Sequence, residues 1–278
     1  MKVTKWCLYS SFFFLGDNIA NARGEDWRRR RDVLVPHFQG RVIIPELFPF
    51  ILKSTTDLVE EIRSHNGQPI DLDERFVTLT ANIICEYIFG GVPDDGHLAF
   101  DNFSRPASAI ATIKLKHVLK LFGIKGKSLL EIERNSKIIR NVIRGVKRGE
   151  RKRQNGSPTL VEEMLQLEEF QGPEGEERLV HELLIMIMAG HDTTAHSLTM
   201  IVYTLAHHPE CQQKIREEVD TIIADDESIT ASDLGKLTYT SAAIRESLRL
   251  HPVIPSLLVH AYEDTSLGDI QVPKGSTV

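Results

Sequence analysis

The chain has 278 residues, of which 41% are hydrophobic and 26% are charged, and its formal net charge is -6 at pH 7. These values are typical of a soluble globular protein that buries a substantial core, and they give no general reason to expect a nucleic-acid partner. The three cysteines, Cys7, Cys85 and Cys211, lie far apart and lack paired metal-ligand spacing. The sequence therefore predicts neither a disulfide framework nor a metal held by cysteines.

The first apolar stretch, from Trp6 to Leu15, is shorter than the roughly 20 residues that span a bilayer. No small-residue cleavage site follows it, so a buried strand or the start of a helix is favoured over a signal peptide. We expect no membrane anchor within this sequence.

Helical periodicity dominates the chain after this stretch. Capping residues, glycines and prolines predict helices over 24–36, 45–67, 71–91 and 128–156, with shorter helices over 97–127. Either Asp71 or Asp73 caps the third of these helices. The basic run over 147–153 suits a solvated helix carboxyl end, which favours that interpretation over a nucleic-acid site.

The longest predicted helix covers about 176–208 and would be roughly 45 Å long. The elements around it are a loop over 171–177, helices from 209 and over 237–252, and extended pieces with turns at 267–269 and 273–275. The sequence therefore predicts a mainly α fold with a small β region, in a single domain covering 1–278.

A polar sequence, AGHDTTAHS at 189–197, interrupts the apolar long helix. Glycine costs about 1 kcal/mol relative to alanine inside a helix, so these residues are tolerated only where something requires them. Ala189 and Gly190 leave room for a flat ligand against the backbone, and Thr193 can donate its hydroxyl to the carbonyl of Ala189. With Asp192 beside it, this arrangement would form a proton relay. The alternative is a break between two helices, capped by Asp192 or Thr193.

A zinc site is the rival interpretation of the same sequence. His191 and His196 are five residues apart and do not share a helix face, unlike the two histidines of a metalloprotease helix. Asp192 and His196 are four apart and can pair, but two ligands form a salt bridge more often than a zinc site.

One ion pair is predicted on the helix over 237–252. Glu246 and Arg249 are three residues apart, and the apolar neighbours Ile244, Leu248 and Leu250 favour a partly buried ion pair over an ordinary surface pair.

Trp27 and Arg31 are four residues apart on one face of the first helix. An indole donor beside a guanidinium is a good clamp for a carboxylate. The alternatives for this arginine run are a solvated helix face or a localisation signal.

The motifs WRRRR, AGHDTT and ESLR, the last followed by LHP, occur in this order with long separations. Together they resemble the cytochrome P-450 family of haem-thiolate monooxygenases, over about residues 16–278. The resemblance implies that Trp27 and Arg31 hold a haem propionate and that Ala189 and Gly190 lie over the porphyrin.

The same resemblance implies that Asp192 and Thr193 are the acid–alcohol pair that supplies protons for dioxygen activation. It also implies that Glu246 and Arg249 form a structural ion pair that supports the haem-binding core. The protein would supply positioning, a proton path and exclusion of water, while the cofactor performs the oxygen chemistry.

The family's axial iron ligand is a cysteine in a glycine-containing loop well downstream of the ESLR helix. This sequence stops at Val278, before that loop, and none of its three cysteines lies in such a context. The resemblance therefore identifies an incomplete cytochrome P-450 domain without its metal ligand. We expect this chain to be inactive as a monooxygenase, because the axial thiolate tunes the iron for dioxygen cleavage.

For the full-length parent, the resemblance implies haem as the cofactor, a small apolar organic substrate, dioxygen, and a redox partner such as a reductase. A eukaryotic parent would be associated with the endoplasmic reticulum membrane. The basic residues Arg28 to Arg30 are expected to face an acidic redox partner. The alternatives from other classes are a non-catalytic helical scaffold or binding protein derived from the same fold, and a zinc hydrolase that uses His191, Asp192 and His196.

Overall fold

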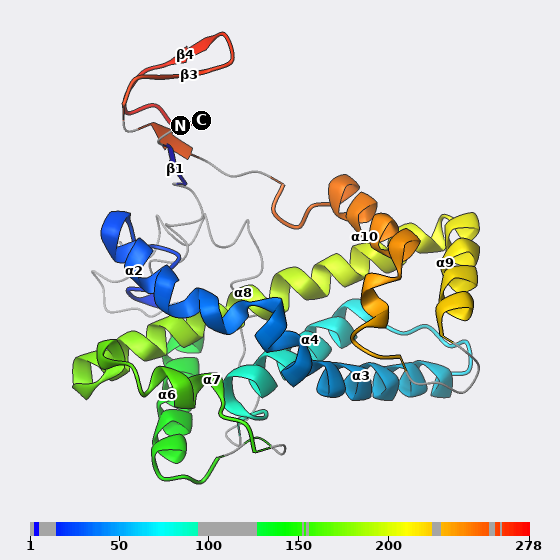
Figure 1. Cartoon of the computed structure of the whole chain (residues 1–278), viewed down its shortest axis with the longest axis horizontal. Coiled ribbons are helices and arrows are strands. Elements are labelled where there is room, and N and C mark those ends of the chain that lie inside the picture. Colours follow the sequence, from blue (N-terminus) through cyan, green and yellow to red (C-terminus); the bar gives the residue numbers. More distant parts are fainter. Residues whose placement is uncertain are drawn as a thin grey trace. The chain divides into compact units, whose positions relative to one another are not determined.

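A computed structural model describes residues 3–5, 15–93, 127–151, 153, 156–223, 229–255, 259–261 and 263–278. The chain forms two compact units, which are described separately. The first comprises Met1–Val33, Val92–Met188 and Ser256–Val278, and the second comprises Leu34–Gly91 and Ala189–Pro255. Helices dominate both, as predicted (Figure 1). Residues 6–14 and 97–126, for which a strand or helices were predicted, lie outside the described residues.

The first unit is built on α2 (Gly24–Leu34), α6 (Lys127–Lys147), α7 (Leu160–Met164) and the first half of α8 (Gly172–Ala206). Ion pairs from Arg140 to Glu177, at 2.7 Å, and from Lys147 to Glu176 join α6 to α8. Fully buried residues at helical spacing form the core of this unit: Ile139, Ile143, Leu160, Val161, Met164, Leu179, Leu183, Leu184 and Ile187.

The amino end of α8 differs from the prediction, because the segment 171–177 is helical from Gly172 instead of forming a loop. Glycine and proline favour a loop from sequence alone, but Pro173 suits a first helical turn, where no amide hydrogen is needed. A Cβ at Gly175 would lie 2.5 Å from the backbone of Phe170, so only glycine lets the chain pass this close. The long helix itself is confirmed.

Helix α7 was not predicted, although its start carries a sequence signal. Thr159 accepts a hydrogen bond from the Glu162 amide at 3.2 Å, and the Glu162 carboxylate accepts one from the Thr159 amide at 2.6 Å. This reciprocal capping box satisfies two amide groups that a helix start leaves unpaired. Helix α6 ends at Lys147, earlier than predicted, because Gly149 adopts a left-handed φ of 70° just beyond it.

The described residues of the first unit also include four short strands. β1 (Val3–Lys5) pairs antiparallel with β2 (Val259–Ala261), and β3 (Thr265–Leu267) pairs antiparallel with β4 (Ile270–Val272). The turn predicted at 267–269 joins β3 to β4, with Gly268 at a φ of 56°. The small β region is therefore confirmed.

The second unit contains the 3-10 helix η2 (Val35–Phe38), α3 (Gly40–Ser64), α4 (Leu72–Phe89), the second half of α8, α9 (Pro209–Ile222), η4 (Asp233–Gly235) and α10 (Thr238–Leu250). Helices α3 and α4 lie side by side (Figure 1). Leu58 of α3, Phe76 of α4 and Ala195 of α8 are buried in one apolar cluster. This cluster fixes the second half of α8 against both helices.

The two ends of α4 follow the sequence signals closely, whereas the start of α3 does not. Asp71 caps α4 by accepting a hydrogen bond from the Glu74 amide at 3.2 Å, and Gly90 ends it at a φ of 71°. Helix α3 begins at Gly40, five residues before its predicted start, and contains both Pro45 and Pro49. Among the described residues, no helix has the length and apolarity required to cross a membrane.

Helix α10 has no side-chain cap of its own. Instead, the Glu218 carboxylate of α9 accepts hydrogen bonds from the amides of Tyr239 at 2.6 Å and Thr240 at 2.8 Å. Burial acts against this charge, but the hydrogen bonds outweigh it and lower the pKa of Glu218 to about 2. The carboxylate of Glu218, from the preceding helix, thus caps the start of α10.

Candidate functional site

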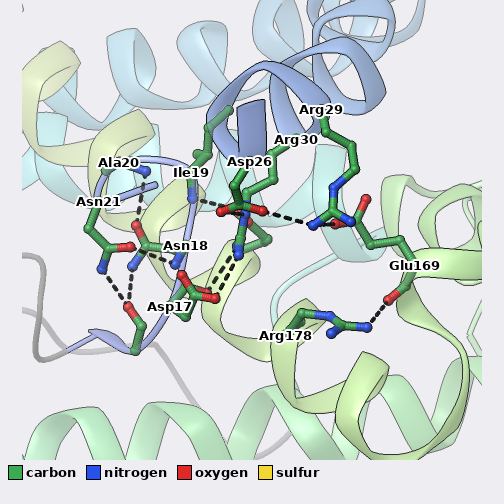
Figure 2. A network of polar contacts seen from close by, with 12 residues as sticks. Asp17, Asn18, Ile19, Ala20, Asn21, Asp26, Arg29, Arg30, Glu169 and Arg178 are labelled. Atoms are coloured by element: carbon green, nitrogen blue, oxygen red, sulfur yellow. Dashed lines mark hydrogen bonds and ion pairs between the residues drawn. The ribbon is translucent and has the colours of Figure 1, made fainter. Parts of the chain in front are cut away.

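Helix α2 carries the four consecutive arginines, and their neighbours differ. Arg28 pairs with Glu25 at 2.5 Å, and both side chains are exposed. Arg29 pairs with Asp26 at 2.8 Å and lies 3.5 Å from Glu169, a contact that Figure 2 shows beside the hydrogen bond from Arg178 to the Glu169 carbonyl. These two arginines form ordinary surface ion pairs.

Arg30 lies at the centre of an ion cluster in which it and Glu182 are buried (Figure 2). Its guanidinium donates to Glu182 of α8 at 2.7 Å, to Asp17 at 2.6 Å and to Asp26 at 3.0 Å. The side chains of Arg30 and Glu182 are 5% and 1% exposed. This cluster fixes α2 against the first half of α8.

A tight turn at residues 16–21 completes the cluster (Figure 2). The Ile19 amide donates to Glu182 at 2.9 Å. The fully buried Asn18 holds the turn in shape, since its side chain donates to the Gly16 carbonyl at 3.0 Å and accepts from the Ala20 amide at 3.0 Å. Both Glu182 oxygens are therefore satisfied.

Burial opposes the charge on Arg30, but its hydrogen bonds to Glu182 and Asp17 outweigh burial and raise its pKa. Burial raises the pKa of Glu182, an effect that the Ile19 amide and Arg30 offset only in part. The prediction that Arg30 faces a redox partner is wrong, because its guanidinium is buried in this internal cluster.

Arg31 differs from the other three arginines. Among the residues that the structure describes, none forms an ion pair with it, and its guanidinium carbon lies 5.7 Å from the centroid of the Trp27 ring. This distance is within the cation–π range. Trp27 is 41% exposed. The structure thus brings together the two residues whose four-residue spacing predicts a carboxylate clamp.

In the second unit, α8 passes through the polar sequence 189–197 without interruption. The alternative of a capped break is therefore wrong. Thr193 donates its hydroxyl to the Ala189 carbonyl at 2.8 Å, as predicted, and Thr194 and Ser197 repeat this pattern with the carbonyls of Gly190 and Thr193 at 3.0 and 2.7 Å. The three hydroxyls thus find acceptors within the helix itself and need no partner outside it.

The two small residues of this sequence have different surroundings. Ala189 is exposed and lies one turn from the half-buried Thr193 on the same face of α8. A Cβ at Gly190 would lie 3.0 Å from Cδ1 of Ile84 in α4. Glycine at position 190 therefore allows α8 and α4 to pack closely, while its role beside a cofactor stays a prediction.

Asp192 lies between two histidines. Its Oδ1 is 3.6 Å from Nε2 of His191 and 3.9 Å from Nε2 of His196. The side chains of Asp192 and His191 are 20% and 6% exposed. The acid is thus partly shielded from solvent and close to two imidazole rings.

His196 also contacts the amino end of α4, where its Nδ1 lies 2.9 Å from Oδ1 of Asp73. The Thr199 hydroxyl donates to the same Asp73 oxygen at 2.6 Å. Burial acts against the charge on Asp73, but the hydrogen bonds from Thr199 and His196 outweigh it and lower its pKa. Of the two candidate caps, Asp71 is the residue that caps α4. Asp73 instead accepts hydrogen bonds from side chains of α8.

The structure forms the predicted Glu246–Arg249 pair, with hydrogen bonds of 2.6 and 2.8 Å. The hydrogen bond from Arg249 lowers the pKa of Glu246. The expectation of partial burial is wrong, because the two side chains are 55% and 68% exposed and the neighbouring Ile244 and Leu248 are exposed as well. This face of α10 points to solvent.

Cys85 is buried inside α4, and Cys211 lies half-buried in the first turn of α9. Both occur within helices, so neither fits an axial haem ligand presented by a loop, and Cys7 lies outside the described residues. No group of three or more His, Cys, Asp or Glu side chains in the described part of the chain is placed to hold a metal ion. The zinc hypothesis thus has no ligand set there.

Sequence reasoning missed two long-range contacts. Arg30 and Glu182 are 152 residues apart, and Asp73 and His196 are 123 residues apart, so no local spacing could pair them. The available signal was Glu182 itself, which is a lone acid within the apolar run LVHELLIM of α8. A charge in such a run needs a buried partner.

Comparison with known proteins agrees with the motifs. A family model described as Cytochrome P450 matches residues 2–278. A protein named Cytokinin hydroxylase from Arabidopsis thaliana is 28% identical, with 95% of this chain and 54% of that protein covered. Cytochrome P450 734A1 from the same plant is 30% identical, with 94% of this chain and 52% of that protein covered. Mouse (Mus musculus) Cytochrome P450 3A25 is 26% identical, with 95% of this chain and 56% of that protein covered. The chain spans about half the length of the curated relatives it matches.

Proposed function

Because the chain belongs to the cytochrome P450 family, we propose that it is part of a haem-dependent monooxygenase. The parent protein would insert one oxygen atom of dioxygen into a small apolar organic substrate, with two electrons from a reductase. The relative named Cytokinin hydroxylase supports hydroxylation as the reaction class. We further propose that residues 1–278 form one incomplete domain of that enzyme, at the endoplasmic reticulum membrane in a eukaryotic cell.

The observation that carries this proposal is that no described residue forms an ion pair with Arg31. The other three arginines of α2 pair with carboxylates of the chain, whereas the described residues offer Arg31 only the ring of Trp27. A guanidinium without an ion-pair partner among the described residues, beside an indole that is 41% exposed, presents several donors to one anion. These two residues fit a haem propionate, which they would hold by charge-assisted hydrogen bonds.

When bound, haem would supply the redox chemistry with dioxygen. The residues of α8 would hold and move protons beside it. Asp192 is only 20% exposed and can exchange a proton with solvent, and the Thr193 hydroxyl, anchored to the Ala189 carbonyl, has lone pairs free to accept one. The exposed Ala189 would leave space for the flat ring.

Glu246 and Arg249 would serve as a structural pair. Their bidentate geometry is already formed in this chain, although both side chains are exposed. Exposed pairs contribute only about 0–1 kcal/mol to stability, so the pair would support the haem-binding core only if another segment covers it.

The experiment is a haem titration of this chain, with Arg31→Gln compared against Arg28→Gln. We expect Arg31→Gln to weaken binding about tenfold, since a charge-assisted hydrogen bond is lost. Arg28→Gln is the matched control, because Arg28 is an exposed arginine of the same helix with an internal partner. Equal affinities for the two variants would refute the clamp.

A further inference from the structure

We propose that His196 is the proton donor to Asp192 and that Asp73 holds its ring in position for this role. The inference rests on the proposed function, in which Asp192 supplies protons beside the cofactor. It adds two residues, from α8 and α4, that lie behind the acid–alcohol pair.

The geometry places one carboxylate on each ring nitrogen of His196. Nδ1 lies 2.9 Å from Oδ1 of Asp73, which is a hydrogen-bond distance, and Nε2 lies 3.9 Å from Oδ1 of Asp192. A single bridging water or a small side-chain rotation closes the longer gap. An imidazole held at one nitrogen and facing an acceptor with the other is the arrangement that proton-transfer catalysts share.

The exposure of the three side chains increases along the chain of contacts. Asp192 is 20% exposed, His196 is 37% exposed and Asp73 is 43% exposed. His191, the other imidazole beside Asp192, is only 6% exposed and is therefore shielded from bulk water. Of the two histidines, His196 is thus the one that can be protonated directly by solvent.

The other surroundings of His196 fix this orientation. The charged groups that face its two ring nitrogens are Asp192 of α8 and Asp73 of α4. The Thr199 hydroxyl donates to the Asp73 oxygen that His196 also contacts, so the carboxylate cannot turn away without losing two hydrogen bonds. Ala195, in the position before His196, is anchored in the apolar cluster of the second unit.

The proton transfer needs only a proton from solvent, which the partly exposed His196 can take up. The Nε2–H bond of the His196 imidazolium breaks, an O–H bond forms on the Asp192 carboxylate, and His196 becomes neutral while keeping its Nδ1–H bond to Asp73. A hydronium ion then reprotonates Nε2, and no electrons are exchanged. Asp73 stabilises the imidazolium electrostatically throughout and stays ionised.

The first test is nitrogen NMR of the His196 ring in the whole chain. The proposal requires the neutral ring to carry its proton on Nδ1, where Asp73 accepts it, so that Nε2 is left as the basic nitrogen. We expect this tautomer in the unmodified chain and its partial loss in Asp73→Asn. A neutral ring protonated on Nε2 in the unmodified chain would overturn the proposal.

The second test measures the coupling to Asp192. In Asp192→Asn the nitrogen chemical shift of His196 Nε2 should change, because the carboxylate that faces this nitrogen is removed. The ring nitrogens of His208, which pairs with Glu210 on a different part of the chain, should keep their chemical shifts as the control. An unchanged His196 Nε2 shift would overturn the proposal, whereas a purely structural role of His196 predicts a response to Asp73→Asn only.

Both tests use the chain without haem, so their outcomes are independent of the haem titration. A His196 ring protonated on Nε2 in the unmodified chain, together with Arg31-dependent haem binding, would leave the proposed function standing and refute the role of His196. The predicted tautomer and coupling without Arg31-dependent haem binding would refute the haem clamp. The coupled Asp73–His196–Asp192 arrangement would then stand without a role beside haem.

Discussion

Removal of one partner from the buried Arg30–Glu182 pair should cost far more stability than removal of any surface ion pair. Glu182→Leu leaves the Ile19 amide without an acceptor and takes from the 5% exposed Arg30 a hydrogen bond of 2.7 Å. A lost charged hydrogen bond and an unsatisfied buried amide each cost roughly 1–3 kcal/mol, about 2–6 kcal/mol together, which brackets the roughly 3–5 kcal/mol usual for a broken buried pair. This is a large share of the roughly 5–15 kcal/mol that stabilises a typical domain.

The assay is chemical denaturation followed by circular dichroism, which gives the free energy of unfolding. The matched control is Lys53→Met, which breaks an i,i+4 pair with Asp57 whose side chains are 75% and 64% exposed, and which should cost less than about 1 kcal/mol. The double variant Arg30→Met, Glu182→Leu should recover part of the loss, because it removes the buried guanidinium that has lost its fully buried partner Glu182. A Glu182→Leu cost no larger than the control would refute the reasoning.

Two other predictions concern the termini of helices and turns. Gly16 has a φ of 79°, and a Cβ there would lie 2.4 Å from the His181 ring; Gly24 has a φ of 55° and open space around it. Gly16→Ala should therefore cost about 2–4 kcal/mol and Gly24→Ala about 1 kcal/mol, and equal melting temperatures would contradict this. Glu218, whose pKa is lowered from 4.5 to about 2, stabilises the folded state above its ordinary pKa and loses this effect as the pH falls from about 4.5 to about 2. Acid titration of Glu218→Gln should show a smaller loss of stability over that window; an identical loss would disprove the inter-helix cap.

Much of the fold follows from local sequence rules because local hydrogen bonds decide it. Asp71 and Gly90 mark the ends of α4 by capping and by a left-handed φ, and Thr193 bonds one turn back along α8. Each of these contacts joins residues that are close in the sequence, so the spacing alone predicts it.

The remaining features depend on contacts between distant segments. Gly172 begins α8 within a segment that reads as a loop, because the close passage over Phe170 cannot be seen from spacing. Arg30 looked like a surface arginine, and only the fold shows that the lone acid Glu182 neutralises it. The partly buried state expected for the Glu246–Arg249 pair failed for the same reason, since burial depends on which segment covers α10.

The central claim is that Trp27 and Arg31 bind a haem propionate, and a titration with haem and with its dimethyl ester tests it most directly. The ester keeps the flat ring and the iron but has no propionate charge. We predict that Arg31→Gln weakens binding of haem about tenfold and leaves binding of the ester unchanged, because only the charged propionate interacts with the guanidinium. An equal effect of Arg31→Gln on both ligands, or no effect on either, would contradict the account.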